Sequence, residues 1–416
     1  MKNLFKRIVI KILILESKLV LKKYKPSIIT VTGSVGKTST KDAIYTVLAM
    51  TGHIRKSDKS FNSDIGIPLT ILGCKNGWND PFLWIKNIFY GLELIMFKSE
   101  YPECLVLEVG SDHPGDILRM TSWLKSDIVV ITKVSEIPVH VEFFKTPEDV
   151  FVEKFSLVKC LKDDGVLIVS ADDRRLLAAS LKVKQKVMTF SIDNLSTVSA
   201  SEVELDPAIG IIFKLKFDDH KYEVKIEGVL GNQQIYPVIA AVTVALARKI
   251  NISDIINSLK KHIAPRGRMN IIAGMNGSTI IDDTYNSSPD ALHEALTALE
   301  KVQVTGRKIA VLGDMMELGR FSAEEHKKAG EHAVRVANIL ITVGPRARQM
   351  DQSAIHFDSS VDAGEYLKGI VGQGDIVLIK GSQFVRLEKA TKAILAEPDR
   401  ASELLVRQDA EWLAKK

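Results

Sequence analysis

The stretch 30–40, with the sequence T-V-T-G-S-V-G-K-T-S-T, constrains this chain more than any other. It follows a short apolar run at 28–29 and opens a helix-forming segment that extends to Leu48. A strand, a glycine turn and a helix start in this order direct backbone N–H groups and the positive end of a helix dipole at a polyphosphate. The stretch therefore predicts a nucleotide-binding loop within an α/β fold.

Within this loop, Lys37 is expected to reach the outer phosphates and Thr38 to hold a magnesium ion. The general pattern G-x-x-x-x-G-K-[ST] requires glycine at position 31, where this chain has Val31, and the first glycine is Gly33. The loop is therefore a variant shortened by two residues. A plain Gly-Lys-Thr surface turn is the alternative, and the flanking strand and helix argue against it. The residues expected to contact the nucleotide are Gly33, Ser34, Val35, Gly36, Lys37, Thr38 and Ser39.

Composition and charge narrow the class of protein. With 416 residues, 46% hydrophobic and 26% charged, the chain is long enough for two or three domains with full cores. The net charge is +5, but residues 1–25 carry +7 and the remainder −2, which argues against a broad nucleic-acid surface. The three cysteines form no C-x-x-C pair, so we expect neither disulfides nor a zinc ribbon, and a reducing cytoplasm fits.

Residues 1–25 form a basic, apolar segment predicted to be an amphipathic helix. Lys11 and Lys18 interrupt its apolar residues, so no charge-free stretch approaches the roughly 20 residues that span a bilayer. At helical spacing, Arg7 and Lys22 fall with them on one cationic stripe. Two interpretations are open: an interfacial helix that makes peripheral membrane contact, and a helix packed on the protein's own body with its lysines in water.

Downstream of the loop, apolar strands alternate with helical segments, which predicts a mostly parallel sheet. The strands of this sheet are expected at 104–109, 127–132 and 165–169. Between 186 and 230 the apolar period changes to two, which indicates a small antiparallel sheet appended to the main one. A helix at 236–248 follows.

The sequence P-R-G-R at 265–268 marks a domain boundary, after which the alternation of strands and helices restarts. A second, Rossmann-like domain is therefore expected. Its strands are predicted at 278–283, 308–312, 338–343 and 375–379. The predicted organisation is an N-terminal helix at 1–25, a central nucleotide-binding domain at 26–264 and a C-terminal domain at 265–416.

Two side chains of the central domain are candidates for metal binding. Glu108 lies at the carboxyl edge of the predicted sheet, where open α/β folds bind ligands, and a carboxylate there suits a metal ion. His140 follows the strand at 127–132 in a loop at the same edge and is a candidate second ligand. A lone loop histidine is more often structural, but a carboxylate beside a phosphate loop favours the metal interpretation.

Lys154 is a third candidate, on a helix predicted over 147–162 with Thr146 as N-cap and Pro147 at its first position. It lies within the apolar stripe of this helix, where desolvation favours the neutral amine. A neutral lysine reacts with carbon dioxide to give a carbamate, an anionic metal ligand. The alternative is a lysine whose stem packs while its head reaches solvent.

Three strand-to-loop segments of the second domain end in polar or glycine-rich sequence: 280–290, 308–319 and 375–382. Each one alone is ordinary for an α/β fold. Because all three follow strands of one sheet, we expect them to converge on a ligand.

Taken in order, these segments resemble the Mur ligases of peptidoglycan synthesis over residues 27–390. Within that family they are most similar to the branch that adds D-alanyl-D-alanine to UDP-N-acetylmuramoyl-tripeptide. The motifs that carry the resemblance are T-G-S-V-G-K-T-S-T, F-N-S-D-I-G-I-P-L-T, L-E-V-G-S-D-H-P-G-D-I, P-V-H-V-E, D-D-T-Y-N-S-S-P, V-L-G-D-M-M-E-L-G and K-G-S.

The resemblance implies an ATP-dependent ligase in which a peptide carboxylate is phosphorylated and an amine attacks the acyl phosphate. Lys37 would neutralise the transferring phosphoryl group, Thr38 and Glu108 would hold one magnesium ion and His140 a second, oriented by carbamylated Lys154. The resemblance also implies that Arg268 reaches ATP, that Gln234 helps to hold adenine and that Asp283 lies near the nucleotide. Candidates near the amino substrate are Asn286, Asp314, Glu317, Lys380 and Ser382.

The sequence departs from the family pattern in three places. Where the family often has asparagine before its histidine motif, this chain has Lys133. The His-Asn pair that helps to hold adenine is replaced by Gln233 and Gln234, whose amides can still read adenine. The family's N-terminal domain grips the uridine nucleotide, whereas about 26 residues precede the loop here, so the hold on UDP is expected to be missing or rebuilt.

The aromatic segment 78–97 is expected to pack against the N-terminal helix, closing a substrate pocket or forming a membrane-facing patch. An additional pair of core helices is the alternative for this segment. Two functional alternatives also stay open: a related ligase that uses another amino acid or acceptor, and a non-catalytic nucleotide-binding partner of an amidotransferase.

Overall fold

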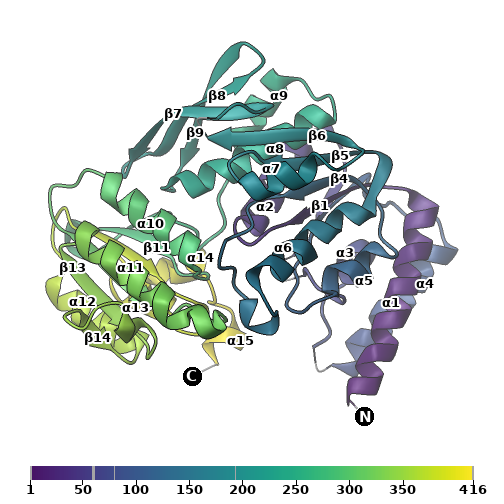
Figure 1. Cartoon of the computed structure of the whole chain (residues 1–416). Coiled ribbons are helices and arrows are strands. Elements are labelled where there is room, and N and C mark those ends of the chain that lie inside the picture. Colours follow the sequence, from purple (N-terminus) through teal and green to yellow (C-terminus); the bar gives the residue numbers. More distant parts are fainter. Residues whose placement is uncertain (1, 59–60, 79, 193, 415–416) are drawn as a thin grey trace.

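The structure is a computed structural model that describes residues 2–58, 61–78, 80–192 and 194–414. It contains two β-sheets, each covered by helices on both faces (Figure 1). The strands of the first sheet are β1 (Ser27–Thr32), β2 (Ile54–Lys56), β3 (Cys104–Glu108), β4 (Ser126–Ile131), β5 (Leu161–Ser170), β6 (Lys186–Ile192), β7 (Val198–Asp206), β8 (Gly210–Phe217) and β9 (His220–Glu227).

The first sheet has the strand order β2-β3-β1-β4-β5-β6-β7-β8-β9. Strands β2 to β7 pair in parallel, and β8 and β9 continue the same sheet in antiparallel pairing. The α/β class and the three predicted parallel strands are confirmed. The predicted antiparallel strands are present and are continuous with the main sheet.

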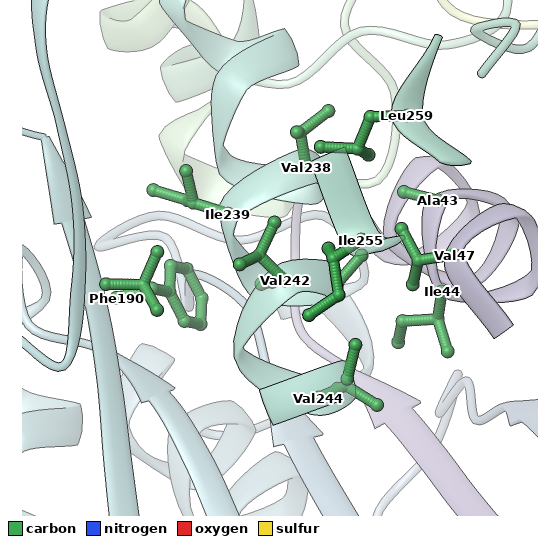
Figure 2. Packing of buried hydrophobic residues seen from close by; sticks show 14 of the residues in the cluster. Ala43, Ile44, Val47, Phe190, Val238, Ile239, Val242, Val244, Ile255 and Leu259 are labelled. Carbon is green, nitrogen blue, oxygen red and sulfur yellow. The ribbon is translucent and has the colours of Figure 1, made fainter. Parts of the chain in front are cut away.

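Alternate residues of the central strands enter two separate cores, as expected for parallel strands that are buried on both faces. Ile29 of β1 faces the core formed with α2 (Lys37–Leu48), α8 (Ile235–Ala247) and α9 (Ile252–Leu259). Figure 2 shows α8 in this core, with α2 and α9 beside it. Ile28 faces the opposite core, to which the N-terminal helices contribute.

The second sheet has the order β10-β11-β15-β12-β13-β14, and only β10 pairs antiparallel. All four strands predicted for this half of the chain are present. The strands are β10 (Asn270–Ala273), β11 (Thr279–Asp283), β12 (Lys308–Gly313), β13 (Ile339–Val343), β14 (Ile355–Phe357) and β15 (Ile376–Lys380). Its main helices are α10 (Pro289–Lys301), α11 (Ser322–Val336), α12 (Ser360–Ile370) and α13 (Glu388–Ala393). The predicted boundary at 264/265 lies between α9 and β10, and the division into domains stays a prediction.

The helix predicted over 147–162 is shorter than expected. The capping box at Thr146 and Asp149 is present, but α6 (Pro147–Phe155) ends seven residues early. A 3₁₀ turn at Ser156–Cys160 follows, and β5 begins at Leu161. The apolar residues after Phe155 fit a helical period by chance, because they belong to a turn and to a strand that packs in the same core.

The N-terminal segment is a single helix, α1 (Lys2–Tyr24), which packs against α3 (Gly66–Leu72) and α4 (Pro81–Met96) (Figure 1). Val9, Leu13 and Val20 are buried in this contact. The predicted packing of segment 78–97 on the N-terminal helix is therefore confirmed. Within the described ranges, we find no helix with the length and apolar character needed to span a bilayer.

Candidate active site

A cavity of about 230 Å³ lies between the two sheets, next to the phosphate loop. The first sheet contributes loop residues together with Asn62, Glu108, Asp112 and His140, and the second contributes the segment that follows β11. The convergence has a simple cause, because the carboxyl ends of parallel strands lie at one edge of a sheet. Of the predicted loop contacts, Ser34, Val35, Gly36, Lys37 and Thr38 line the cavity, whereas Gly33 and Ser39 do not.

The loop adopts a backbone that requires glycine at two positions. Gly33 has φ 145°, and a Cβ there would lie 2.0 Å from Oγ1 of Thr132. Gly36 has φ 83° at the N-cap of α2, which directs the N-terminus of this helix into the cavity. Lys37 donates from Nζ to the carbonyl oxygen of Gly33 at 2.9 Å. Burial lowers the pKa of Lys37, Glu108 opposes that shift and Arg268 adds to it.

Glu108 is the last residue of β3 and is only 4% exposed. Its Oε1 accepts a hydrogen bond from Nδ2 of Asn62 at 3.4 Å, and its Oε2 lies 3.7 Å from Nζ of Lys41. Lys41 also donates to the carbonyl oxygen of Ser57 at 2.8 Å and is 2% exposed. The carboxylate is therefore held from two sides, by one residue of α2 and one of the loop before α3.

His140 forms a contact between the two halves of the molecule. Its Nδ1 lies 2.7 Å from Oε2 of Glu317, which follows β12 in the second half. Its Nε2 lies 3.7 Å from Oδ1 of Asp112 in the first half. The hydrogen bond with His140 lowers the pKa of Glu317. Glu317, predicted near the amino substrate, is thus a partner of the predicted metal ligand.

Lys154 lies within the protein, with 2% of its surface exposed. Its Nζ donates to Oγ of Ser111 at 3.4 Å. Burial, together with the nearby charge of Lys37, lowers the pKa of Lys154 to about 7. The adjacent Glu153 accepts hydrogen bonds from the backbone of Gly115 and Ile117. Burial therefore favours the neutral amine at Lys154, and its carbamylation stays a prediction.

The donors along the cavity suit magnesium. Thr38, Glu108 and Asp112 offer a hydroxyl and two carboxylates, and Mg²⁺ is commonly held by one or two carboxylates together with substrate phosphates. In the part of the chain that the structure describes, no three His, Cys, Asp or Glu side chains form a complete metal site. The residues present fit an ion that is also bound by a nucleotide.

A second cavity, of about 170 Å³, adjoins the loop on the side of α8. Asp172, Phe190, Gln233 and Tyr236 line it, so aromatic rings and polar groups that can read a base edge lie together. Gln234, which we predicted to contact adenine, is buried, donates to the carbonyl oxygen of Arg268 at 3.1 Å and does not line this cavity. Its neighbour Gln233 lines the cavity instead, and the adenine contact of Gln234 stays a prediction.

The predicted residues of the second half divide into a lining set and a supporting set. Arg268 and Asn286 line the main cavity, and the guanidinium of Arg268 lies over the ring of Tyr285 at 4.2 Å. Asp283 and Lys380 are buried and form an ion pair at 2.7 Å. Lys380 also donates to the carbonyl oxygen of Asn286 at 2.9 Å, so the pair holds the segment after β11.

Asp314 and Ser382 likewise act behind the cavity surface. Oδ1 of Asp314 accepts hydrogen bonds from the backbone N–H groups of Arg346 and Ala347, at 2.9 and 2.7 Å. Oγ of Ser382 accepts from the backbone N–H of Met316 at 2.9 Å. Neither residue lines the main cavity, and their contacts support the loops that follow β12, β13 and β15.

The fold and the cavity define the class: a nucleotide-binding α/β protein whose phosphate loop is faced by a second sheet domain. Two family models match the chain, the Mur ligase middle domain over residues 86–245 and the Mur ligase, glutamate ligase domain over residues 267–383. The chain belongs to the Mur ligase family.

Similar proteins support this assignment at both the sequence and the structural level. The chain is 28% identical to the UDP-N-acetylmuramoyl-tripeptide--D-alanyl-D-alanine ligase of Mycobacterium tuberculosis, covering 89% of this chain and 73% of that protein. It is 28% identical to the Bacillus subtilis enzyme of the same name, covering 92% and 79%. The crystal structure of MurF ligase from Thermotoga maritima in complex with ADP aligns with a TM-score of 0.80 at 25% identity, covering 95% and 84%.

Proposed function

We propose that this protein is an ATP-dependent ligase that adds D-alanyl-D-alanine to UDP-N-acetylmuramoyl-tripeptide. One observation carries the proposal: the phosphate loop, Glu108 and His140 share a single cavity with Arg268 and Asn286 of the other sheet domain. The names of the relatives supply the substrate assignment. We place the reaction in the cytoplasm, in keeping with the three free cysteines.

In the proposed reaction, a carboxylate oxygen of the tripeptide attacks the γ-phosphorus of ATP and the bond to ADP breaks. The amine nitrogen of D-alanyl-D-alanine then attacks the acyl carbon, phosphate leaves and the nitrogen releases a proton. Lys37 and Arg268 supply the positive charge that stabilises the transferring phosphoryl group, because both line the cavity. The N-terminus of α2 adds backbone donors at the same place.

Magnesium and a carbamate belong to this proposal. Bound Mg²⁺ would neutralise phosphate charge, with Thr38 and Glu108 as protein ligands of one ion and His140 of a second. Lys154 would form the carbamate when its neutral amine attacks carbon dioxide and loses a proton. The burial of Lys154 and its lowered pKa support this step.

Adenine is assigned to the second cavity. The side-chain nitrogen and oxygen of Gln233 are both shielded from solvent and make no hydrogen bond to any described residue. An amide can donate to one atom of an adenine edge and accept from another. The rings of Phe190 and Tyr236 line the same cavity and offer stacking surfaces.

The test is phosphate release from ATP in the presence of UDP-muramoyl-tripeptide, with D-alanyl-D-alanine or single amino acids as the amine. We expect release that depends on both substrates and is fastest with the dipeptide. Lys37→Met should abolish it, whereas Lys327→Met, which changes an exposed lysine of α11, should not. Release that requires a single amino acid would overturn the substrate assignment, and no release with any amine would overturn the reaction.

A further inference from the structure

Helix α4 exposes an uninterrupted apolar stripe. Phe82, Ile85, Phe89, Leu92 and Met96 recur at spacings of three and four residues, and their exposed fractions range from 41% to 80%. At 3.6 residues per turn they occupy about 80° of the helix circumference. Apolar residues scattered singly over a surface need no explanation, but a stripe of five along one helix does.

The opposite face of α4 is already used by the fold. Trp84, Asn87, Gly91 and Leu94 are buried there, and Gly91 lies against the side chain of Glu16 in α1. The exposed stripe is therefore distinct from the face of α4 that packs in the core, because that opposite face already contacts α1. Helices α1 and α4 lie together at the edge of the molecule remote from the second sheet (Figure 1).

Helix α1 contributes positive charge at this edge of the molecule. Residues 1–25 hold eight lysines and arginines and one acidic residue, Glu16, which is buried. The exposed cations include Arg7, Lys11, Lys18 and Lys22, on the outer side of α1. The exposed apolar residues of that helix, Ile8, Leu15 and Leu19, lie among these cations.

We propose that the helix pair α1 and α4 docks on an anionic lipid bilayer, through the exposed apolar stripe of α4 and the exposed cations of α1. The apolar stripe would enter the boundary between headgroups and acyl chains, and the lysines would contact anionic headgroups, as in interfacial amphipathic helices. The proposal concerns where the protein resides and is independent of the reaction assigned to the cavity.

The positive charge of residues 1–25 favours a bilayer, rather than a second copy of the chain, as the partner of the helix pair. A two-fold contact through the helix pair would bring the cationic segment 1–25, with net charge +7, near its own copy. Like charges at an interface oppose association, whereas an anionic surface attracts each of the exposed lysines.

The experiment is flotation of the full-length protein with phosphatidylcholine vesicles, with and without phosphatidylglycerol, at low and high salt. We expect recovery with the anionic vesicles that falls as salt rises. F82S/F89S should lower the partition coefficient at least about tenfold, because two exposed aromatic anchors are lost. The matched control L195S/I263S changes two apolar residues outside the helix pair that are more exposed than Phe82 and Phe89, and it should stay within about twofold of wild type.

Charge reversal provides an independent arm. K11E/K18E should weaken binding to anionic vesicles more than about tenfold at low salt, whereas K301E/K327E, with the same change in net charge, should not. Thermal unfolding of each variant checks that the fold is retained. The proposal is overturned if wild type stays in the soluble fraction, if F82S/F89S floats like wild type, or if F82S/F89S abolishes a wild-type dimer seen by ultracentrifugation without changing flotation.

Discussion

Two regions of this molecule bury a polar side chain that has no hydrogen-bond partner among the residues described, and they do so with opposite consequences. In the cavity beside α8, the amide of Gln233 is shielded and unpaired. In the helix pair, both carboxylate oxygens of Glu16 are shielded and unpaired against Gly91. Gln233 borders a cavity that a ligand can enter, so binding can satisfy it. Glu16 is packed by a helix, so burial favours its neutral, protonated form and raises its pKa to about 7.

The same contrast separates two buried lysines near the main cavity. Lys380 keeps an ion pair with Asp283 at 2.7 Å, whereas Lys154 donates only a long hydrogen bond to Ser111 at 3.4 Å. Burial lowers the pKa of both amines. Asp283 opposes the shift at Lys380 through a direct ion pair, whereas Asp112 and Glu153 oppose it at Lys154 without one. A buried amine that is paired with a carboxylate stabilises the structure, whereas a buried amine without an ion pair is available for chemistry or titration.

The largest expected effect is that of Lys154→Ala. Phosphate release should fall by about 1,000-fold or more, because the carbamate would be lost, and added bicarbonate should restore none of it. Lys159→Ala, which changes an exposed lysine of the next turn, is the matched control. Carbon-13 NMR of wild type in labelled bicarbonate should show a carbamate that is absent from the variant. Near-normal turnover by Lys154→Ala would show that Lys154 takes no part in the chemistry and would contradict the proposed difference between Lys154 and Lys380.

Lys380→Met should act on stability. Leaving Asp283 charged and unpaired is expected to cost about 3–5 kcal/mol in the free energy of unfolding, measured with urea. The double variant Lys380→Met/Asp283→Leu should recover part of this loss, because it removes the stranded charge. Lys301→Met is the exposed control. A loss below about 1 kcal/mol would mean that Lys380 is as uncompensated as Lys154.

Glu16→Gln tests the buried carboxyl group of Glu16 through the pH dependence of the free energy of unfolding. Because the folded-state pKa of Glu16 is raised from 4.5 to about 7, its contribution is fully present below pH 4.5 and is lost as pH rises through 7. Wild type should lose on the order of 3 kcal/mol over this window relative to Glu16→Gln, measured by urea unfolding between pH 5 and 9. Glu93→Gln, exposed on α4, should keep the wild-type profile. Parallel profiles of wild type and Glu16→Gln would show that the carboxylate finds a partner.

The smallest expected effect is that of Gln233→Ala on nucleotide affinity. The KM for ATP should rise about tenfold with kcat little changed, because an amide that reads a base contributes on the order of 1 kcal/mol. Gln234→Ala should lower the melting temperature instead, since Gln234 is bonded to the backbone of Arg268. If Gln234→Ala raised the KM for ATP and Gln233→Ala lowered the melting temperature, the adenine contact would be assigned to Gln234 instead.

Residues of the main cavity could be predicted from the sequence where they lie at the ends of predicted strands. Glu108 and His140 were recognised because each follows an apolar strand, and the sheet edge brings them together, whereas Arg268 was implied by the family resemblance. Asn62 and Asp112 were missed as individual site residues. Both lie in irregular loops, where no period indicates which side chains face inward.

Adjacent residues were harder to separate than distant ones. Gln233 and Gln234 lie in one 3₁₀ turn, in which successive side chains point about 120° apart, so the sequence alone does not tell which one enters the cavity. The end of α6 was misplaced for a related reason. A turn and a strand that return to the same core extended the apolar pattern beyond Phe155.

The packing of α8 on α2 has a consequence for synthesis of the chain. Ile44 and Val47 of α2 are fully buried, in the core that includes α8 (Figure 2), yet roughly 190 residues separate the end of α2 from the start of α8. At about 5–20 residues per second, a ribosome needs on the order of 10–40 s to make that interval. The nascent chain therefore carries the phosphate loop on a helix whose apolar face lacks α8 for nearly half of its translation, and exposed apolar surface of this kind is what chaperones bind.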